Sequence, residues 1–197
     1  MNKNIVLCGV GGQGIVLAAK LLAATAMENG LNVMSAETIG MAQRGGSVFS
    51  FVKIGESVDT PMMGNGTADL IIGFEPGESV RVLPYLKEGG TVITSDRPVV
   101  PVSASLRPES YQAGEMISYL QKTVPDLHVI HAEQVLQELG SDKVLNVVML
   151  GAVAETGVLG FSADEMLRIV KERVPARFVE LNTRAFEAGR KIVAERA

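Results

Sequence analysis

The chain has 197 residues, of which 47% are hydrophobic and 20% charged, and its formal net charge is −4. A chain of this composition can bury a full core, so we expect a single folded domain over residues 1–197 and exclude a disordered protein. Because no block of Lys or Arg stands out, Trp is absent and only 3 Tyr and 6 Phe occur, we expect no nucleic-acid partner.

The first predicted strand, Ile5–Cys8, runs directly into a glycine-rich turn with the spacing G-x-G-x-x-G, and an apolar helix follows. We expect Gly9 to reverse the chain at positive φ, Gly11 to let a ligand approach the backbone, and Gly14 to let the helix lie close on the strand. The free N–H groups at the start of the helix would then face an anion. The alternative is that the glycines serve only strand-to-helix packing. The candidate binding residues of this turn are Gly9, Gly11, Gly12, Gln13 and Gly14.

The helix predicted from Ile15 to Asn29 is apolar nearly all round, which indicates burial against the sheet and leaves open a contact with another subunit. The next strand, Leu31–Ala36, ends at Glu37, 23 residues after Gly14. A dinucleotide-binding βαβ unit carries an acid that binds ribose about 20 residues after its glycines. Dinucleotide binding with Glu37 as a cofactor contact is therefore one hypothesis.

The loop from Glu37 to Gly46 holds three glycines together with Gln43 and Arg44. Open α/β sheets bind ligands in loops at the carboxyl ends of their strands, and the planar guanidinium of Arg44 suits a carboxylate or a phosphate. The alternative is an ordinary surface arginine in a Gly-Gly turn. A strand is predicted next, over Ser47–Ile54, with bulky side chains on both faces.

The rest of the chain alternates strands with helices, which is typical of a mostly parallel sheet with helices on both faces. We therefore expect an α/β fold, a Rossmann-like three-layer sandwich with a mostly parallel, mixed sheet and a helical C-terminal third. Asp96–Ser110 is the least regular stretch. The remaining predicted elements are strands at Asp69–Phe74, Thr91–Ser95 and Leu127–His131, a short helix through Val80, Leu83 and Leu86 that closes at Gly89–Gly90, helices at Tyr111–Thr123 and Val144–Glu155, and two further helices after the capping box Ser162–Glu165 and after Pro175.

The sequence offers the layout of a binding site without an evident catalytic apparatus. No Ser/His/Asp arrangement, Walker A pattern or ligand cluster of cysteines or histidines can be assembled, and His128 and His131 point to opposite faces of one strand. Glu37 and Glu75 at strand ends could transfer protons, and the alternative role is hydrogen bonding to loop N–H groups. We predict no catalytic residue and no metal ligand, and either a binding module or one part of a larger enzyme.

Cys8 is the single cysteine, so this chain can form neither an internal disulfide nor a four-cysteine iron–sulfur site. Its mean hydropathy is +0.24, but no apolar run approaches the roughly 18 residues of a membrane helix. The N-terminus is unlike a secretory signal. We expect a cytoplasmic protein without a membrane partner.

Four motifs follow one another along nearly the whole chain: Gly9–Ile15, Gly40–Val48, Ala68–Pro76 and Asn146–Ala152. Together they resemble the gamma domain of the 2-oxoacid:ferredoxin oxidoreductases. Within that family, the sequence Gly-Met-Ala-Gln-Arg-Gly-Gly-Ser at residues 40–47 is most similar to the small, beta-type subunits of the indolepyruvate enzymes.

The resemblance implies oxidative decarboxylation of an aryl 2-oxoacid, with coenzyme A as acyl acceptor and ferredoxin as electron acceptor, by an enzyme that is active only as a complex. Thiamine diphosphate, Mg and the iron–sulfur clusters would be held by a large catalytic subunit, and this chain would complete the substrate or coenzyme A site. At the matching positions of this sequence, the resemblance implies a site that comprises the first glycine loop and a second loop with Arg44 as an anion contact. The candidates in that second loop are Gln43, Arg44, Gly45, Gly46 and Ser47.

Two other hypotheses stay open. One is a stand-alone nucleotide-binding module that uses the Gly9–Gly14 turn and Glu37. The other is a non-catalytic scaffold, for which Arg44→Ala would leave turnover of the assembled complex unchanged. The sequence leaves open which 2-oxoacid is used, what binds the glycine loop and the stoichiometry of the complex.

Overall fold

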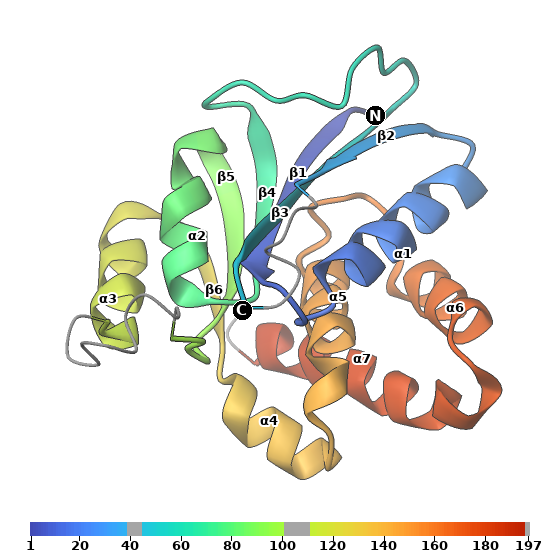
Figure 1. Ribbon diagram of the computed structural model, residues 1–197. Coiled ribbons are helices and arrows are strands. Elements are labelled where there is room, and N and C mark those ends of the chain that lie inside the picture. Colours follow the sequence, from blue (N-terminus) through green and yellow to red (C-terminus); the bar gives the residue numbers. More distant parts are fainter. Residues whose placement is uncertain (39–44, 101–110, 196–197) are drawn as a thin grey trace.

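The computed structural model describes residues 1–38, 45–100 and 111–195, and these form a mixed β-sheet with helices on both faces (Figure 1). The strand order is β2-β3-β1-β4-β5-β6. Strands β1, β4, β5 and β6 run parallel, whereas β3 is antiparallel to both of its neighbours. The predicted α/β class with a mostly parallel, mixed sheet is confirmed. The strands are β1 (Lys3–Val10), β2 (Asn32–Glu37), β3 (Ser47–Gly55), β4 (Ala68–Gly73), β5 (Leu86–Ser95) and β6 (Asp126–Ile130).

Strand β1 is buried on both faces because it lies inside the sheet and both of its faces are covered by helices. Ile5 and Leu7 belong to one hydrophobic cluster, and Val6 and Cys8 belong to the other, as the alternation of side chains along a strand requires. All four are completely buried. A strand covered in this way appears in the sequence as a continuous apolar run.

The helices divide between the two faces of the sheet (Figure 1). The larger cluster lies under the helices on the first face, and the smaller cluster lies under α2 and α3 on the second. Among the described helices, none is long and apolar enough to cross a membrane. The first face carries α1 (Ile15–Glu28), α4 (Ala132–Leu139), α5 (Leu145–Thr156), α6 (Ala163–Arg173) and α7 (Val179–Ala194), and the second carries α2 (Pro76–Val82) and α3 (Ala113–Thr123).

The predicted C-terminal end of the helix through Val80, Leu83 and Leu86 is wrong. Helix α2 stops at Val82, a 3₁₀ turn spans Leu83–Tyr85, and β5 begins at Leu86. Leu86 pairs with Ala68 of β4, and the register shifts before the next pair. The glycines at 89 and 90 therefore serve an irregularity inside β5, as glycines often do in strands, rather than closing a helix.

The predicted start of the next helix is also too early, because α3 begins at Ala113 and Tyr111 lies before it. The predicted capping box is confirmed. The Ser162 hydroxyl accepts from the Glu165 N–H at 3.2 Å, and the Glu165 carboxylate accepts from the Ser162 N–H at 2.8 Å. These paired bonds satisfy two N–H groups that helix α6 would otherwise leave open.

Candidate functional site

The glycine turn joins the end of β1 to the start of α1, and the predicted role of Gly9 is wrong. Gly9 lies within β1, opposite Val48 of β3, and it is not among the glycines with positive φ. The left-handed residues are Gly12, with φ of 104°, and Gly14, with φ of 82°. A Cβ on Gly9 would lie 2.5 Å from Oε1 of Gln13. The chain therefore reverses later than predicted, and Gly9 makes room for a side chain of the turn.

Gln13 braces the turn with both ends of its side-chain amide. Its Oε1 accepts from the Val10 N–H at 2.7 Å, and its Nε2 donates to the Phe74 carbonyl at 2.9 Å. Phe74 follows β4 directly, so these bonds fasten the turn to the carboxyl end of the neighbouring strand. These two bonds leave the amide one further N–H donor and one further acceptor lone pair.

Gly14 lies against helix α5, whereas the prediction placed it where the helix packs on the strand. A Cβ on Gly14 would come within 2.9 Å of Nδ2 of Asn146, which is 4% exposed. Gly14 is also the N-cap residue of α1 and has the left-handed conformation that favours glycine. The first and the last of the four sequence motifs thus meet at this point of the structure.

The two glycine loops lie together, as expected for the site that the family resemblance implies. The Gly11 N–H donates to the Gly46 carbonyl at 2.9 Å, and Ser47 lies opposite Val10 in the β1–β3 ladder. Gly45 is exposed and has φ of 82°. The remaining two candidates of the second loop, Gln43 and Arg44, lie outside the described residues.

Glu37 ends β2, but its surroundings differ from those of an ordinary dinucleotide-binding unit. In the usual strand order the second strand lies beside the first, whereas here β3 lies between β1 and β2. Glu37 is paired with Ser50 of β3 and is about 10 Å, two strand spacings, from β1 in the plane of the sheet. Its role as a ribose contact stays a prediction, and the sequence spacing from Gly14 no longer supports it.

Two pockets open on either side of the glycine turn. The smaller, of about 310 Å³, lies toward Thr38 and Val48. The larger, of about 760 Å³, lies toward α5 and is lined by the buried Asn146 together with Arg97 and Lys143. The Arg97 guanidinium is paired with the Asp142 carboxylate at 3.1 Å. Backbone N–H groups, an amide and two cationic side chains suit a ligand with anionic oxygens.

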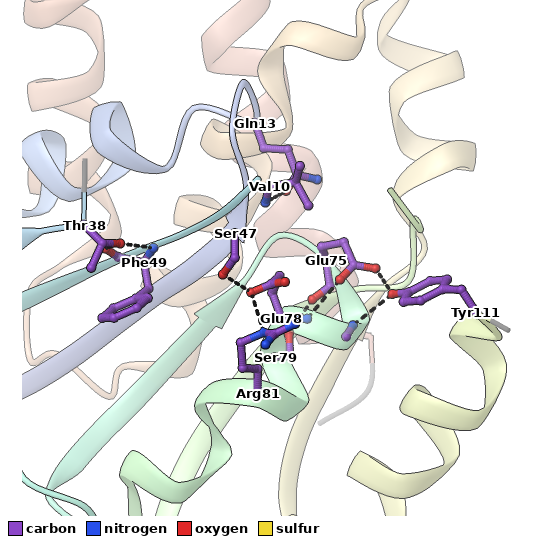
Figure 2. A network of polar contacts seen from close by, with 11 residues as sticks. Val10, Gln13, Thr38, Ser47, Phe49, Glu75, Glu78, Ser79, Arg81 and Tyr111 are labelled. Carbon is purple, nitrogen blue, oxygen red and sulfur yellow. Dashed lines mark hydrogen bonds and ion pairs between the residues drawn. The ribbon is translucent and has the colours of Figure 1, made fainter. Parts of the chain in front are cut away.

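A cluster of acidic side chains lies beside the glycine loops, at the carboxyl end of β4 (Figure 2). Glu75 is the N-cap residue of α2 and accepts from the Glu78 N–H at 2.9 Å, so it accepts from a backbone N–H as the alternative role predicts, but that N–H lies in the first turn of a helix and not in a loop. The Tyr111 hydroxyl donates to the other Glu75 oxygen and accepts from the Gly77 N–H at 3.1 Å. The Ser47 hydroxyl donates to Glu78 at 2.5 Å.

Sequence reasoning missed Glu78 and Tyr111 as members of this site. The available signal was Pro76, because proline favours the first position of a helix. It places Glu75 at the N-cap and Glu78 at the third helical position, where an acidic side chain is expected to interact with the start of the helix. Nothing in the sequence indicates that Tyr111 returns to the same place.

Burial shifts the pKa values of three groups in this region. It raises the pKa of the Glu75 carboxyl, although the hydrogen bond from Tyr111 counteracts the shift. It also raises the pKa of the Tyr111 hydroxyl, and the adjacent Glu75 adds to that shift. Burial likewise raises the pKa of the Cys8 thiol, with a contribution from Glu78. Cys8 is therefore a protonated and unreactive core residue.

Within the described residues, no three His, Cys, Asp or Glu side chains are grouped so that they could hold a metal ion. Both histidines lie near carboxylates: His128 Nε2 is 3.1 Å from Asp126, and His131 Nδ1 is 2.7 Å from Asp96. These contacts agree with the structural roles that the sequence predicts for both residues.

The fold and the geometry define the class of the protein: an α/β domain in which two glycine loops meet beside the carboxyl end of β4. The chain belongs to the pyruvate ferredoxin/flavodoxin oxidoreductase family, which matches residues 4–192. Its family resemblance is therefore confirmed.

Similar proteins include subunits named for several 2-oxoacids. The chain is 38% identical to indolepyruvate oxidoreductase subunit IorB of Thermococcus kodakarensis, covering 98% of this chain and 96% of that protein. It is 36% identical to subunit IorB of Methanothermobacter thermautotrophicus, covering 99% and 100%. It is 29% identical to 2-oxoglutarate synthase subunit KorC of Methanothermobacter marburgensis, covering 99% and 98%.

Solved structures share the fold. The gamma subunit of a keto/oxoacid ferredoxin oxidoreductase from Geobacter sulfurreducens superimposes with a TM-score of 0.70 and 26% identity, over 98% of this chain and 99% of that chain. The 2-oxoglutarate:ferredoxin oxidoreductase of Magnetococcus marinus gives a TM-score of 0.73 over 98% of this chain and 31% of that longer chain. At 19% identity, the second likeness shows the fold alone.

Proposed function

We propose that this chain is the small subunit of a thiamine diphosphate-dependent 2-oxoacid:ferredoxin oxidoreductase whose substrate is indolepyruvate or another aryl 2-oxoacid. The observation that carries the proposal is the 36–38% identity to indolepyruvate oxidoreductase subunits over nearly the whole length of both chains. The identity to a 2-oxoglutarate subunit is lower, at 29%. The complex is proposed to act in the cytoplasm.

In the proposed reaction, the carboxylate of the 2-oxoacid leaves as CO₂, the acyl carbon is joined to the thiol sulfur of coenzyme A, and the electrons released pass to ferredoxin. Thiamine diphosphate with Mg and the iron–sulfur clusters would supply decarboxylation and electron transfer from a large partner subunit. The described part of this chain contains no grouped metal ligands of its own, which is compatible with that division.

The contribution of this chain is to complete the binding site for the substrate or coenzyme A. The turn at Gly11–Gly14 lies between two pockets, and its glycines let a ligand approach the backbone closely. Arg97 and Lys143 add positive charge to the larger pocket. Arg44 is proposed as a further anion contact on the strength of the family resemblance alone.

The apolar side chains that remain exposed on α1 are proposed to pack on the large subunit. Leu17 is 43% exposed and Met27 is 65% exposed, although the opposite side of α1 is buried against the sheet and α6. Under this proposal the large subunit covers both side chains and removes them from water.

The proposal is tested by isolating the tagged chain from its native host under anaerobic conditions. A large brown partner and dye reduction that depends on both indolepyruvate and coenzyme A would support it, and competition among 2-oxoacids would then identify the substrate. If the chain elutes alone, is colourless and retains a nucleotide, the stand-alone nucleotide-binding module is correct instead. Oxidation of a substrate with a nicotinamide cofactor by this chain alone would also refute the proposal.

A further inference from the structure

Glu78 is a buried carboxylate beside the two glycine loops, on the first turn of α2 (Figure 2). Its side chain is 7% exposed. The Ser47 hydroxyl donates to Glu78 Oε2 at 2.5 Å, and the Arg81 Nε lies 3.2 Å from the same oxygen. The Arg81 side chain is 65% exposed and Ser47 is also an exposed residue, so both partners reach the buried carboxylate from the surface of the molecule.

Stability alone does not explain a carboxylate in this position. Burying a charged group is costly unless it is paired, and apolar replacements of buried ion pairs often leave a protein equally stable or more stable. An apolar side chain could reproduce neither the interactions of Glu78 with Arg81 and the start of α2 nor its directed hydrogen bond to Ser47, and only the bond to Ser47 leads to the glycine loops. The hydrogen bond to Glu78 therefore determines how the Ser47 side chain is oriented.

Ser47 stands where the second glycine loop enters the sheet. It is the first residue of β3 and lies opposite Val10 at the end of β1. The residue before it, Gly46, accepts the hydrogen bond from Gly11 at 2.9 Å. A continuous path thus runs from Glu78 through Ser47 and Gly46 to the backbone of the first glycine turn.

We propose that Glu78 is a positioning residue: acting through Ser47, it holds the Gly45–Gly46 end of the second loop against the Gly11 backbone and so determines the shape of the ligand-binding edge. Its effect on turnover rests on the proposed function. Its effect on the structure of the two loops does not.

The kinetic experiment compares single and double variants in the assembled complex. Glu78→Ala and Ser47→Ala are each expected to raise the KM for coenzyme A or the 2-oxoacid about tenfold, with kcat changed less than about twofold, because a misplaced binding loop weakens binding. The double variant is expected to be no worse than either single variant, since both remove one interaction. Glu78→Gln keeps an acceptor oxygen for Ser47 and should recover most of the affinity.

Arg81→Gln is the matched control, because it removes the exposed partner of Glu78 and leaves Ser47 in place. It should keep the KM within about twofold of the wild-type value, as expected for an exposed ion pair. Additive effects of the Ser47 and Glu78 substitutions, or a fall in kcat and thermal stability with KM unchanged, would refute the positioning role and leave Glu78 as a core residue only.

A second measurement does not depend on activity. Amide hydrogen exchange reports the Gly11 N–H, whose acceptor is the Gly46 carbonyl. Glu78→Ala should accelerate exchange at Gly11 at least about tenfold through local opening, and Arg81→Gln should not. Unchanged protection in Glu78→Ala would refute the inference. If the wild-type complex shows no turnover dependent on coenzyme A, the proposed function fails, and this exchange experiment still decides the role of Glu78.

Discussion

Two glutamates at the start of α2 are both buried, yet they differ in what surrounds them. Glu75 caps the helix and accepts a hydrogen bond from the Tyr111 hydroxyl. Glu78 accepts a hydrogen bond from the Ser47 hydroxyl and lies beside Arg81. Glu75 therefore has neutral donors and no cationic partner within the described residues. Burial raises its pKa because removal from water penalises the charged form.

This shift predicts a specific pH dependence of stability. The folded chain holds the Glu75 proton more tightly than the unfolded chain, whose carboxyl has the ordinary pKa of 4.5, so the free energy of unfolding falls as pH rises above that value. We expect Glu75→Gln to remove this fall. The difference is measured by urea unfolding of the wild type and the variant from about pH 4 to about pH 8, a range that begins near the ordinary carboxyl pKa and extends above it.

Tyr111→Phe is the companion variant, because the Tyr111 hydrogen bond lowers the Glu75 pKa. Its loss should steepen the fall of stability with pH. In the Glu75→Gln background, Tyr111→Phe should have no effect on the pH dependence. Parallel pH profiles for the wild type and Glu75→Gln would show that this carboxyl does not change its affinity for the proton on folding.

At the scale of elements, helices α5 and α7 pack closely through a glycine on each helix. A Cβ on Gly151 of α5 would lie 1.9 Å from the Phe186 carbonyl oxygen, and a Cβ on Gly189 of α7 would lie 1.9 Å from the Val148 carbonyl oxygen. Each helix thus presents a glycine to the backbone of the other. The absence of a side chain at these two positions is what lets the helix backbones approach so closely.

Gly151→Ala is therefore expected to destabilise the chain by about 3 kcal/mol or more, because the helices must separate to admit the methyl group. The matched control is Gly114→Ala in α3, where a Cβ would meet nothing within 4 Å. That change should be neutral or should stabilise the chain by about 0.5–1 kcal/mol through helix propensity. Equal unfolding free energies of the two variants in chemical denaturation would contradict the packing argument.

At the scale of the whole molecule, the sheet is covered on both faces, and the face with α1 still carries exposed apolar side chains. Leu17 on α1 and Phe178 before α7 line a common pocket of about 210 Å³. They are 43% and 40% exposed. Under the proposed function, this surface belongs to the contact with the large subunit.

Leu17→Lys should therefore weaken the complex at least about tenfold, equivalent to roughly 1.4 kcal/mol, because it places a charge in an apolar contact. The stability of the isolated chain should change by less than about 0.5 kcal/mol, since the side chain is on the surface. Tyr119→Lys, at an exposed position of α3, is the control and should leave assembly intact. Titration of the large subunit with each variant measures the affinities, and an unaffected Leu17→Lys complex would place the interface elsewhere.

Much of the fold was accessible from the sequence, because burial on both faces produces continuous apolar runs and helices carry their own start and stop residues. The strand at Ile5–Cys8, the capping box at Ser162 and the helical C-terminal third were predicted on these grounds and are confirmed. The α2–β5 boundary was not, since Gly89 and Gly90 favour a helix end and a strand irregularity equally well from local chemistry.

Continuous apolar runs and four motifs in order were enough to predict the α/β class, the glycine turn and the family. The order of the strands and the meeting of distant side chains depend on the tertiary fold. It inserts β3 between β1 and β2, separating Glu37 from the turn, and it brings Ser47 to Glu78 across 31 positions of sequence. Local propensity carries no information about such pairings, because they depend on how distant apolar faces are buried together.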